Sequence, residues 1–113
     1  FDNLYYNYNS TEILESASHE LNLLYESMKE NPKMRIQLSA HTDSRGNFLY
    51  NKELSIKRAN SAKKYLIKKG IDESRIKTIG FGESRVRNHC IDGVECNEEE
   101  HAFNRRTEVL VIE

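Results

Sequence analysis

The residues best suited to bind a ligand lie between a short strand-like run and the helix-like segment that follows it. His41-Thr42-Asp43 comes directly after the alternating residues 35–40, and Arg58 lies early in a helical pattern that begins after the turn-rich residues 44–47. Open α/β sheets bind ligands just outside the carboxyl ends of their strands. Asp43 and Arg58 are therefore the first candidates for a binding site. The alternative is an ion pair that ties the strand to the helix.

A catalytic interpretation of the same motif is weaker. Strand alternation through the motif predicts that His41 and Asp43, two residues apart, point to the same face of the sheet. A His–Asp pair also needs a nucleophile, and neither of the two cysteines stands in a recognisable catalytic setting. We therefore expect no enzyme activity.

Cys90 and Cys96 lie in one polar, loop-like segment that contains Asp92-Gly93. We favour a disulfide between them, which would stabilise the fold by about 2 kcal/mol on a chain-entropy estimate. It would also indicate an oxidising, extracytoplasmic compartment. A zinc site that adds His89 or His101 is one alternative, although no second CxxC or HxxxH spacing supports it. Two free thiols are the other.

The acidic residues around this segment raise the question of a calcium site. They lack the ligand order of an EF-hand loop, so a solvated helix face is the better interpretation. The sequence thus predicts no metal and no cofactor. The acidic residues concerned are Asp92, Glu95, Glu98, Glu99 and Glu100.

Hydrophobic periodicity predicts a long first helix. Apolar residues recur at steps of three and four along one face, at Leu14, Ala17, Leu21, Leu24 and Met28. Candidates for the N-cap of this helix are Asn9, Ser10 and Thr11. Asn31-Pro32 ends it, because the residue before a proline is disfavoured in the helical region.

The remaining elements follow from alternation and turn residues. A second helix ends at Lys69-Gly70, with Ile71 packing back over its end, and a short helical piece covers residues 97–103. Strands are expected over residues 4–9, 35–40, 75–80 and 105–113. The order βαβαβ, short helix, β predicts an α/β fold, an α+β two-layer sandwich with two main helices on a mixed sheet. The last strand is apolar on both faces, which indicates an interior position.

Composition limits the classes of function. The 113 residues suit one domain with one core. The 17 basic and 18 acidic residues nearly cancel, which removes the strongly basic surface expected of a duplex nucleic-acid binder. No apolar run approaches the ~20 residues of a membrane-spanning helix. The chain starts at Phe1 without a signal-peptide pattern, so we expect a domain excised from a longer protein.

Six blocks occur in a fixed order along the chain. They are His41-Thr42-Asp43 with Gly46, Tyr50-Asn51, Leu54-Ser55 with Arg58-Ala59, Gly70-Ile71, Gly80-Phe81-Gly82-Glu83, and Asn104-Arg105-Arg106. This order resembles the OmpA-like C-terminal peptidoglycan-binding domain of the OmpA/Pal/MotB-like family. The resemblance runs from about Leu4 to Ile112. It implies one such domain over residues 1–113, with the same two-layer architecture.

The resemblance also implies a function. It is the non-catalytic binding of diaminopimelate in the peptidoglycan stem peptide, which anchors an outer-membrane or envelope protein to the cell wall in the periplasm. Asp43 would bind the ligand ammonium. Arg58 would bind its carboxylate, because the planar guanidinium can donate two parallel hydrogen bonds. The domain itself would not insert into the membrane, and the tether would lie outside this sequence. A protein-interaction module of an envelope complex is the alternative function on the same fold.

Weaker site candidates follow from the same resemblance. Asn51 would contact the stem peptide or cap the second helix, and Asn9 would lie near the ligand or form a turn. Thr42 and Ser44 would offer hydroxyl or backbone N–H groups. Arg106 would lie at the rim of the pocket or pair with an acidic residue of the fold.

The chain departs from the commoner family pattern in two places. Ser84-Arg85-Val86 stands where family members often have a proline, and the segment from Cys90 to Cys96 is longer and more acidic than usual. Both differences concern the rim of the expected pocket, and so Arg106, more than Asp43 and Arg58.

Overall fold

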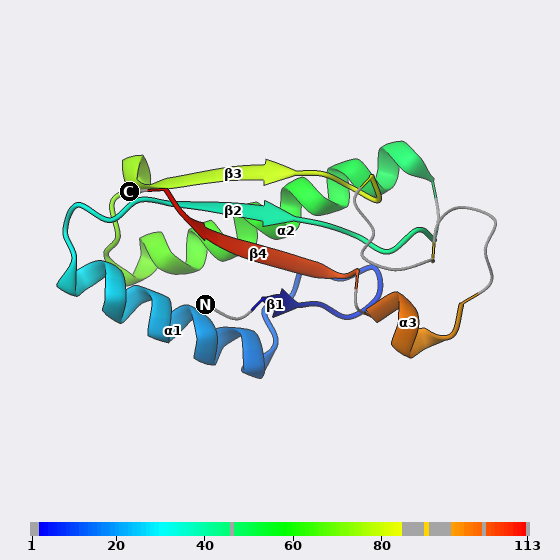
Figure 1. Cartoon of the computed structure of the whole chain (residues 1–113), viewed down its shortest axis with the longest axis horizontal. Coiled ribbons are helices and arrows are strands. Elements are labelled where there is room, and N and C mark those ends of the chain that lie inside the picture. Colours follow the sequence, from blue (N-terminus) through cyan, green and yellow to red (C-terminus); the bar gives the residue numbers. More distant parts are fainter. Residues whose placement is uncertain (1–2, 46, 85–89, 91–95, 103, 113) are drawn as a thin grey trace.

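The computed structural model describes residues 3–45, 47–84, 90, 96–102 and 104–112. Four strands form one sheet, and the two long helices pack against it (Figure 1). The predicted class and element order are confirmed. In chain order the elements are β1 (Leu4–Tyr5), α1 (Glu15–Glu30), β2 (Ile36–Ala40), α2 (Phe48–Lys69), a 3₁₀ turn (Glu73–Arg75), β3 (Ile76–Gly80), α3 (Glu98–Ala102) and β4 (Arg106–Val111).

The sheet is mixed, with the strand order β1-β4-β2-β3. The crossover through α2 makes β2 and β3 parallel, with Ala40 opposite Gly80 at their carboxyl ends. Pairing continues past these ends, because the Phe81 N–H donates to the Ala40 carbonyl at 2.9 Å and the Thr42 N–H donates to the Gly82 carbonyl at 2.9 Å. The His-Thr-Asp and Gly-Phe-Gly-Glu motifs therefore lie side by side at one edge of the sheet.

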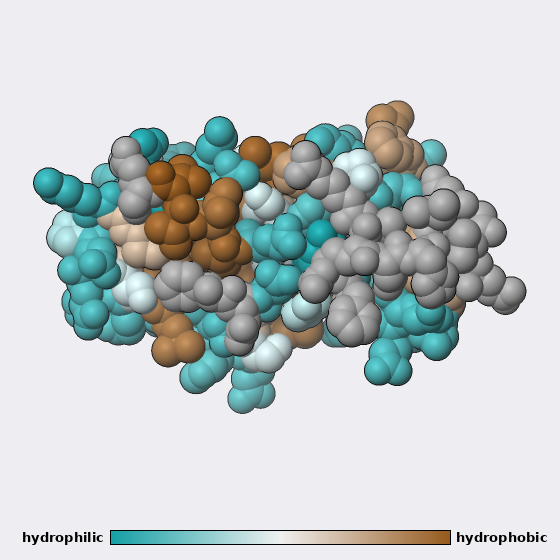
Figure 2. All heavy atoms as spheres, viewed as in Figure 1, coloured by the Kyte–Doolittle hydropathy of each residue, from teal (hydrophilic) through white to brown (hydrophobic). Residues whose placement is uncertain are grey.

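β4 runs antiparallel to both of its neighbours, β1 and β2. The predicted interior position of this strand is confirmed. Its C-terminal end is nevertheless exposed at Leu110 (53%), Val111 and Ile112. Hydrophobic residues gather over this end of the strand on the face shown in Figure 2. An interior place in the order of strands therefore does not require that both faces be covered.

The core lies between the helices and the sheet. The predicted stripe of α1 is buried at Ala17, Leu21, Leu24 and Met28. Full burial of a large aliphatic side chain stabilises a fold by about 1.5–3 kcal/mol. The residues that complete this core are Leu4, Tyr6, Ile36, Leu38, Ala62, Leu66, Ile71 and Ile76. In the described part of the chain, no helix has the length and apolarity needed to cross a membrane.

Local signals set both ends of α2. The Asn47 side chain caps the helix, accepting from the N–H groups of Leu49 at 2.8 Å and Tyr50 at 3.2 Å. Gly70 ends it with φ +118°, a conformation that glycine adopts without a Cβ penalty. The Ile71 N–H then donates to a carbonyl of the last turn, and its side chain is only 5% exposed. The predicted packing of Ile71 is confirmed.

The N-terminal segment differs from the prediction. β1 has two residues instead of the six expected, and Asn9 adopts a positive φ of +55° in the turn that follows. α1 begins after Leu14, which makes no side-chain capping bond. Asn9, Ser10 and Thr11 lie too far upstream to cap the helix, so that prediction is wrong. The turn instead brings this segment beside the end of β2.

Candidate ligand-binding site

A small cavity lies where β2 ends and α2 begins. Its volume is about 30 Å³, room for about two water molecules. Both Asp43 and Arg58 line it, together with residues of the N-terminal segment. The full lining comprises Tyr8, Asn9, Thr42, Asp43, Arg45, Tyr50, Asn51, Leu54 and Arg58.

Asp43 is 3% exposed and already carries strong hydrogen bonds. Its Oδ1 accepts from the Arg45 backbone N–H at 3.0 Å, and its Oδ2 accepts from Arg45 Nη2 at 2.9 Å and Arg105 Nη1 at 3.4 Å. Burial by itself would raise the pKa of Asp43. The hydrogen bonds from Arg45 and Arg105 outweigh that effect and hold the pKa below its usual range. Asp43 is thus a fixed anion at neutral pH.

Arg58 is fully buried and is held by backbone carbonyls. Nε donates to Ser10 at 2.8 Å, Nη1 to His41 at 3.2 Å and Nη2 to Asn7 at 3.0 Å. These three bonds connect α2, the end of β2 and the N-terminal segment. Burial lowers the pKa of Arg58 to about 10, so the group still carries its charge at neutral pH.

No carboxylate of the described residues lies within 4.0 Å of the Arg58 guanidinium. A direct ion pair between Asp43 and Arg58, the alternative to a binding site, is therefore wrong. A guanidinium group has five N–H donors. Three are used, so two remain, and Arg58 is one of the residues that line the cavity. Arg58 thus keeps a positive charge that no anion in the described part of the chain neutralises by direct contact.

Asp43 belongs to a cyclic network of ion pairs. Glu98, at the start of α3, binds Arg45 Nη2 through Oε2 at 3.1 Å and Arg105 Nη2 through Oε1 at 2.7 Å. The two arginines in turn bind Asp43. Arg45 also lies over the ring of Tyr8, with 4.0 Å between Cζ and the ring centroid. The acidic stretch expected to be a solvated helix face therefore supplies one residue of the site.

Asn51 connects the loops around the cavity. Its amide nitrogen donates to the Arg45 carbonyl at 2.9 Å and to Glu83 Oε1 at 3.2 Å. Its Oδ1 has no hydrogen-bond partner in the described part of the chain and can accept from a ligand. The suggested capping role is wrong, because Asn47 caps α2.

Of the other predicted residues, Asn9 and Thr42 line the cavity and Ser44 does not. Asn9 lines the cavity, and its Oδ1 accepts from the Tyr50 hydroxyl. Thr42 also lines the cavity, but its hydroxyl is already bound to the Asp43 carbonyl at 2.9 Å. Ser44 is buried and is not part of the lining.

The structure does not bring Arg106 to the cavity. Its Nε pairs with Glu108 Oε2 at 3.3 Å, so its predicted position at the rim is wrong and the pairing with an acidic residue is confirmed. Arg105, one residue earlier, reaches Asp43 instead. Adjacent residues at the beginning of a strand have side chains on opposite sides of the sheet. An error of one residue in the expected beginning of the strand therefore exchanges the positions of Arg105 and Arg106.

His41 and Asp43 do not share a face. β2 ends at Ala40, so the alternation of strand side chains does not extend to Asp43. His41 Nε2 lies 3.1 Å from Glu108 Oε1, and its ring stacks on Phe81 at 5.2 Å between centroids. The geometry of the described residues gives no support to a His–Asp catalytic pair.

Sequence reasoning missed six residues of the site. Tyr8, Arg45, Tyr50 and Leu54 line the cavity, Arg105 binds Asp43, and Glu98 binds Arg45 and Arg105. Tyr50, Leu54 and Arg105 belong to the ordered blocks, which offered a signal for them. Tyr8 and Arg45 had none, because they meet only when the N-terminal turn folds against the end of β2.

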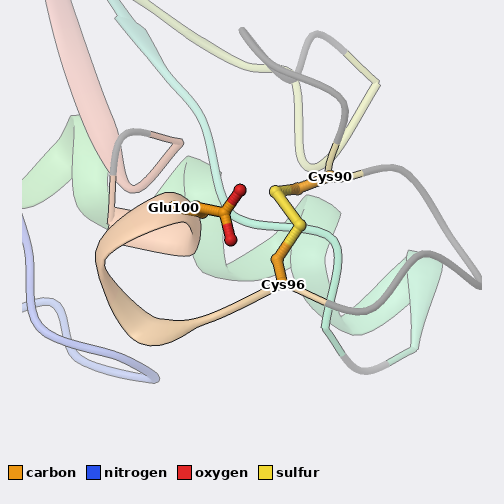
Figure 3. Close-up of side chains that lie close together, drawn as sticks. All are labelled: Cys90, Cys96 and Glu100. Carbon is orange, nitrogen blue, oxygen red and sulfur yellow. A yellow bond between two sulfur atoms is a disulfide. The ribbon is translucent and has the colours of Figure 1, made fainter.

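The disulfide between Cys90 and Cys96 is present, with the two Cα atoms 6.0 Å apart. Both cysteines of the chain are in it, so the free-thiol and zinc interpretations are wrong for these sulfur atoms. Figure 3 shows the Glu100 carboxylate beside the bridge, with its oxygen within 4.8 Å of the two sulfurs. Bonded sulfur is a poor metal ligand, since zinc binds thiolates. The candidates His89, Asp92 and Glu95 lie outside the described residues.

Comparison with known proteins identifies relatives that match nearly the whole length of this chain. Residues 5–99 match the model of the OmpA family. The chain is 31% identical over 107 residues to a peptidoglycan-associated lipoprotein of Buchnera aphidicola, covering 95% of this chain and 59% of that protein. It is 32% identical over 106 residues to outer membrane porin F of Pseudomonas fluorescens, covering 94% of this chain and 31% of the porin. The chain thus corresponds to part of each relative.

Solved structures show the same architecture. The peptidoglycan-associated lipoprotein of Burkholderia pseudomallei superposes with a TM-score of 0.87 at 22% identity, over 96% of this chain and 88% of that one. The cell wall anchor of the T6SS of Pseudomonas aeruginosa superposes with a TM-score of 0.73 at 21% identity, over 95% and 73% of the two chains. At these identities the likeness concerns the fold, whereas the family is given by the sequence match. The chain belongs to the OmpA family.

Proposed function

We propose that this chain is a non-catalytic module that binds the stem peptide of peptidoglycan through its diaminopimelate residue. It would thereby anchor an outer-membrane or other envelope protein to the cell wall, with residues 1–113 as the binding domain. Membership of the OmpA family supports this proposal, as do relatives whose names describe peptidoglycan association and a cell wall anchor.

The observation that carries the proposal is the charge balance at the cavity. Asp43 and Glu98 supply two negative charges, and the three arginines 45, 58 and 105 supply three positive charges. The cluster therefore has one net positive charge, located on a guanidinium group with two unused donors. The surplus charge favours a ligand carboxylate at Arg58, and the neighbouring Asp43 carboxylate offers a partner for an ammonium on the same ligand.

Each residue has a defined role in this proposal. Asp43 binds the ammonium of diaminopimelate, and Arg58 binds the adjacent carboxylate through its two remaining N–H groups. Asn51 accepts a hydrogen bond through Oδ1, and Asn9 and Thr42 shape the wall of the cavity. Affinity for one ligand would be modest, because a small polar ligand loses hydration as it gains contacts. Many copies on one polymeric wall would compensate through avidity.

The disulfide fits the compartment that this function requires. Disulfides persist in oxidising environments such as the bacterial periplasm, where the cell wall lies. We therefore place the domain in the periplasm, on a tether to the outer membrane. No step of the proposed function requires a cofactor or a metal.

Co-sedimentation with purified, protein-free peptidoglycan tests the proposal. The wild type should sediment with the wall fragments, and free diaminopimelate should compete. Asp43→Asn should lose sedimentation, because the variant keeps the shape of the side chain without its charge. Asp72→Asn is a matched control, since Asp72 is an exposed N-cap residue at another part of the fold. Failure of the wild type to sediment would contradict wall binding and would favour a protein partner.

A further inference from the structure

We propose that Arg45 occupies the ammonium subsite of the cavity and is displaced when a ligand binds, and that Glu98 is the positioning residue that receives it. This inference rests on the proposed function, because it concerns the same cavity. It adds to that function a side chain of the protein, Arg45, that competes with the ligand ammonium for Asp43. It also adds a residue, Glu98, that lies outside the ordered sequence blocks.

The first observation is the size of the cavity. Its volume of about 30 Å³ makes it a narrow space, and the Arg45 side chain is one of its walls beside Asp43. Arg45 Nη2 lies 2.9 Å from Asp43 Oδ2, at the distance where a ligand N–H would bind. A cation of the protein therefore takes the place of the ligand cation, and binding requires that this side chain move.

The second observation shows which arginine can move. The Arg105 side chain is 7% exposed, and its Nε is fixed to the Tyr6 carbonyl at 2.7 Å. The Arg45 side chain is 33% exposed, and its Nε is buried without a hydrogen-bond partner in the described part of the chain. Arg45 is thus held more weakly, and its departure would free one lone pair of Asp43 and enlarge the cavity.

The third observation shows where Arg45 would go. Glu98 Oε2 is already 3.1 Å from Arg45 Nη2, and the Glu98 side chain is 62% exposed. The Tyr8 ring, 4.0 Å from Arg45 Cζ, offers a second favourable contact for the cation. Neither of these two contacts involves Asp43. Arg45 can therefore break its ion pair with Asp43 and keep its contacts with Glu98 and Tyr8. Without Glu98, Asp43 would be the only carboxylate left to Arg45 among the described residues.

Calorimetric titration with free diaminopimelate measures both roles. Arg45→Ala should raise affinity about two- to fivefold, the worth of one partly exposed ion pair. The backbone N–H that binds Asp43 remains in that variant. Arg45→Lys keeps a competing cation and should stay closer to the wild type. Glu98→Gln should lower affinity by about the same factor, because Arg45 then stays on Asp43.

A double-mutant cycle separates this role of Glu98 from a purely structural one. In the Arg45→Ala background, Glu98→Gln should change affinity by less than half as much as it does in the wild-type background. The reason is that the Arg45 side chain, which Glu98 would otherwise bind, is absent. Glu99→Gln, which makes the same charge change on the same helix, should leave affinity unchanged in both backgrounds. Circular dichroism establishes that each variant is folded.

The outcomes are distinct. If the wild type binds neither diaminopimelate nor wall fragments, the proposed function and this inference are both overturned. If the wild type binds and Arg45→Ala binds equally or more weakly, only this inference is overturned. An effect of Glu98→Gln that is equal in both backgrounds would likewise overturn the role of Glu98.

Discussion

Arg58 supports the fold as well as the site, and the substitution Arg58→Lys separates these contributions. The guanidinium group donates to three backbone carbonyls from three different nitrogens. A lysine ammonium is a single point with donors on one atom, so it can keep about one of these bonds. The His41 carbonyl is buried and the Ser10 and Asn7 carbonyls are partly buried, so two carbonyls with limited access to water would then lose their partner. A buried group left unsatisfied costs about 1–3 kcal/mol, and a partly buried one lies at the low end of that range. The expected loss for two groups is therefore about 2–4 kcal/mol in the free energy of unfolding.

Urea denaturation provides the assay. The chain has six tyrosines and no tryptophan, so far-UV circular dichroism or tyrosine fluorescence can follow the transition. The expected loss is a large part of the 5–15 kcal/mol that stabilises a typical domain. Binding by Arg58→Lys must therefore be measured on protein shown to be folded under the same conditions.

Arg75→Lys is a matched control. Arg75 also donates to three backbone carbonyls, those of Met28, Asn31 and Met34, but it is only partly buried and far from the cavity lining. Water can reach these groups, so the loss should be about 1–2 kcal/mol, and ligand binding should be unchanged. A loss below about 1 kcal/mol for Arg58→Lys, or a larger loss for Arg75→Lys, would refute this account of Arg58.

Three further predictions concern the stability of the fold. The pKa of Asp43 is lowered in the folded state, so the stabilising contribution of its carboxylate is present above the unfolded pKa of about 4 and is lost as pH falls through the folded pKa. Below a pH of about 4 the Tm should therefore fall more steeply for the wild type than for Asp43→Asn. Parallel curves of Tm against pH would argue against this contribution. The double substitution Cys90→Ser and Cys96→Ser should lower the free energy of unfolding by about 2 kcal/mol, measured in urea, and an unchanged midpoint would show that the bridge adds nothing. Gly80→Ala should destabilise by about 1–3 kcal/mol, because the new Cβ would lie 2.6 Å from the Ile56 backbone nitrogen and 2.7 Å from Ser55 Oγ; a wild-type Tm would mean that α2 can shift away from β3.

Much of the fold could be predicted because its signals are local. The apolar stripe from Ala17 to Met28 and the helix end at Gly70-Ile71 follow from periodicity and from the conformational freedom of glycine. The position of Asp43 and Arg58 at one edge of the sheet follows from a strand, a short turn and a helix in that order. These features depend on neighbours in the sequence.

The remaining features depend on contacts between distant segments. Whether Arg105 or Arg106 reaches Asp43 depends on the residue at which β4 begins, because a shift of one residue exchanges the two faces. Glu98 joins the site only because α3 folds back toward the end of β2, and Arg45 meets Tyr8 only through the turn at Asn9. The spacing of residues along the sequence does not indicate these contacts.

The central claim is that Asp43 and Arg58 present opposite charges to one ligand in one cavity. Calorimetric titration of the wild type and of Asp43→Asn with free diaminopimelate tests it most directly. We expect measurable binding by the wild type and at least about tenfold weaker binding by the variant, because the ligand ammonium would lose its charged partner. Equal affinities for the two proteins would contradict the claim.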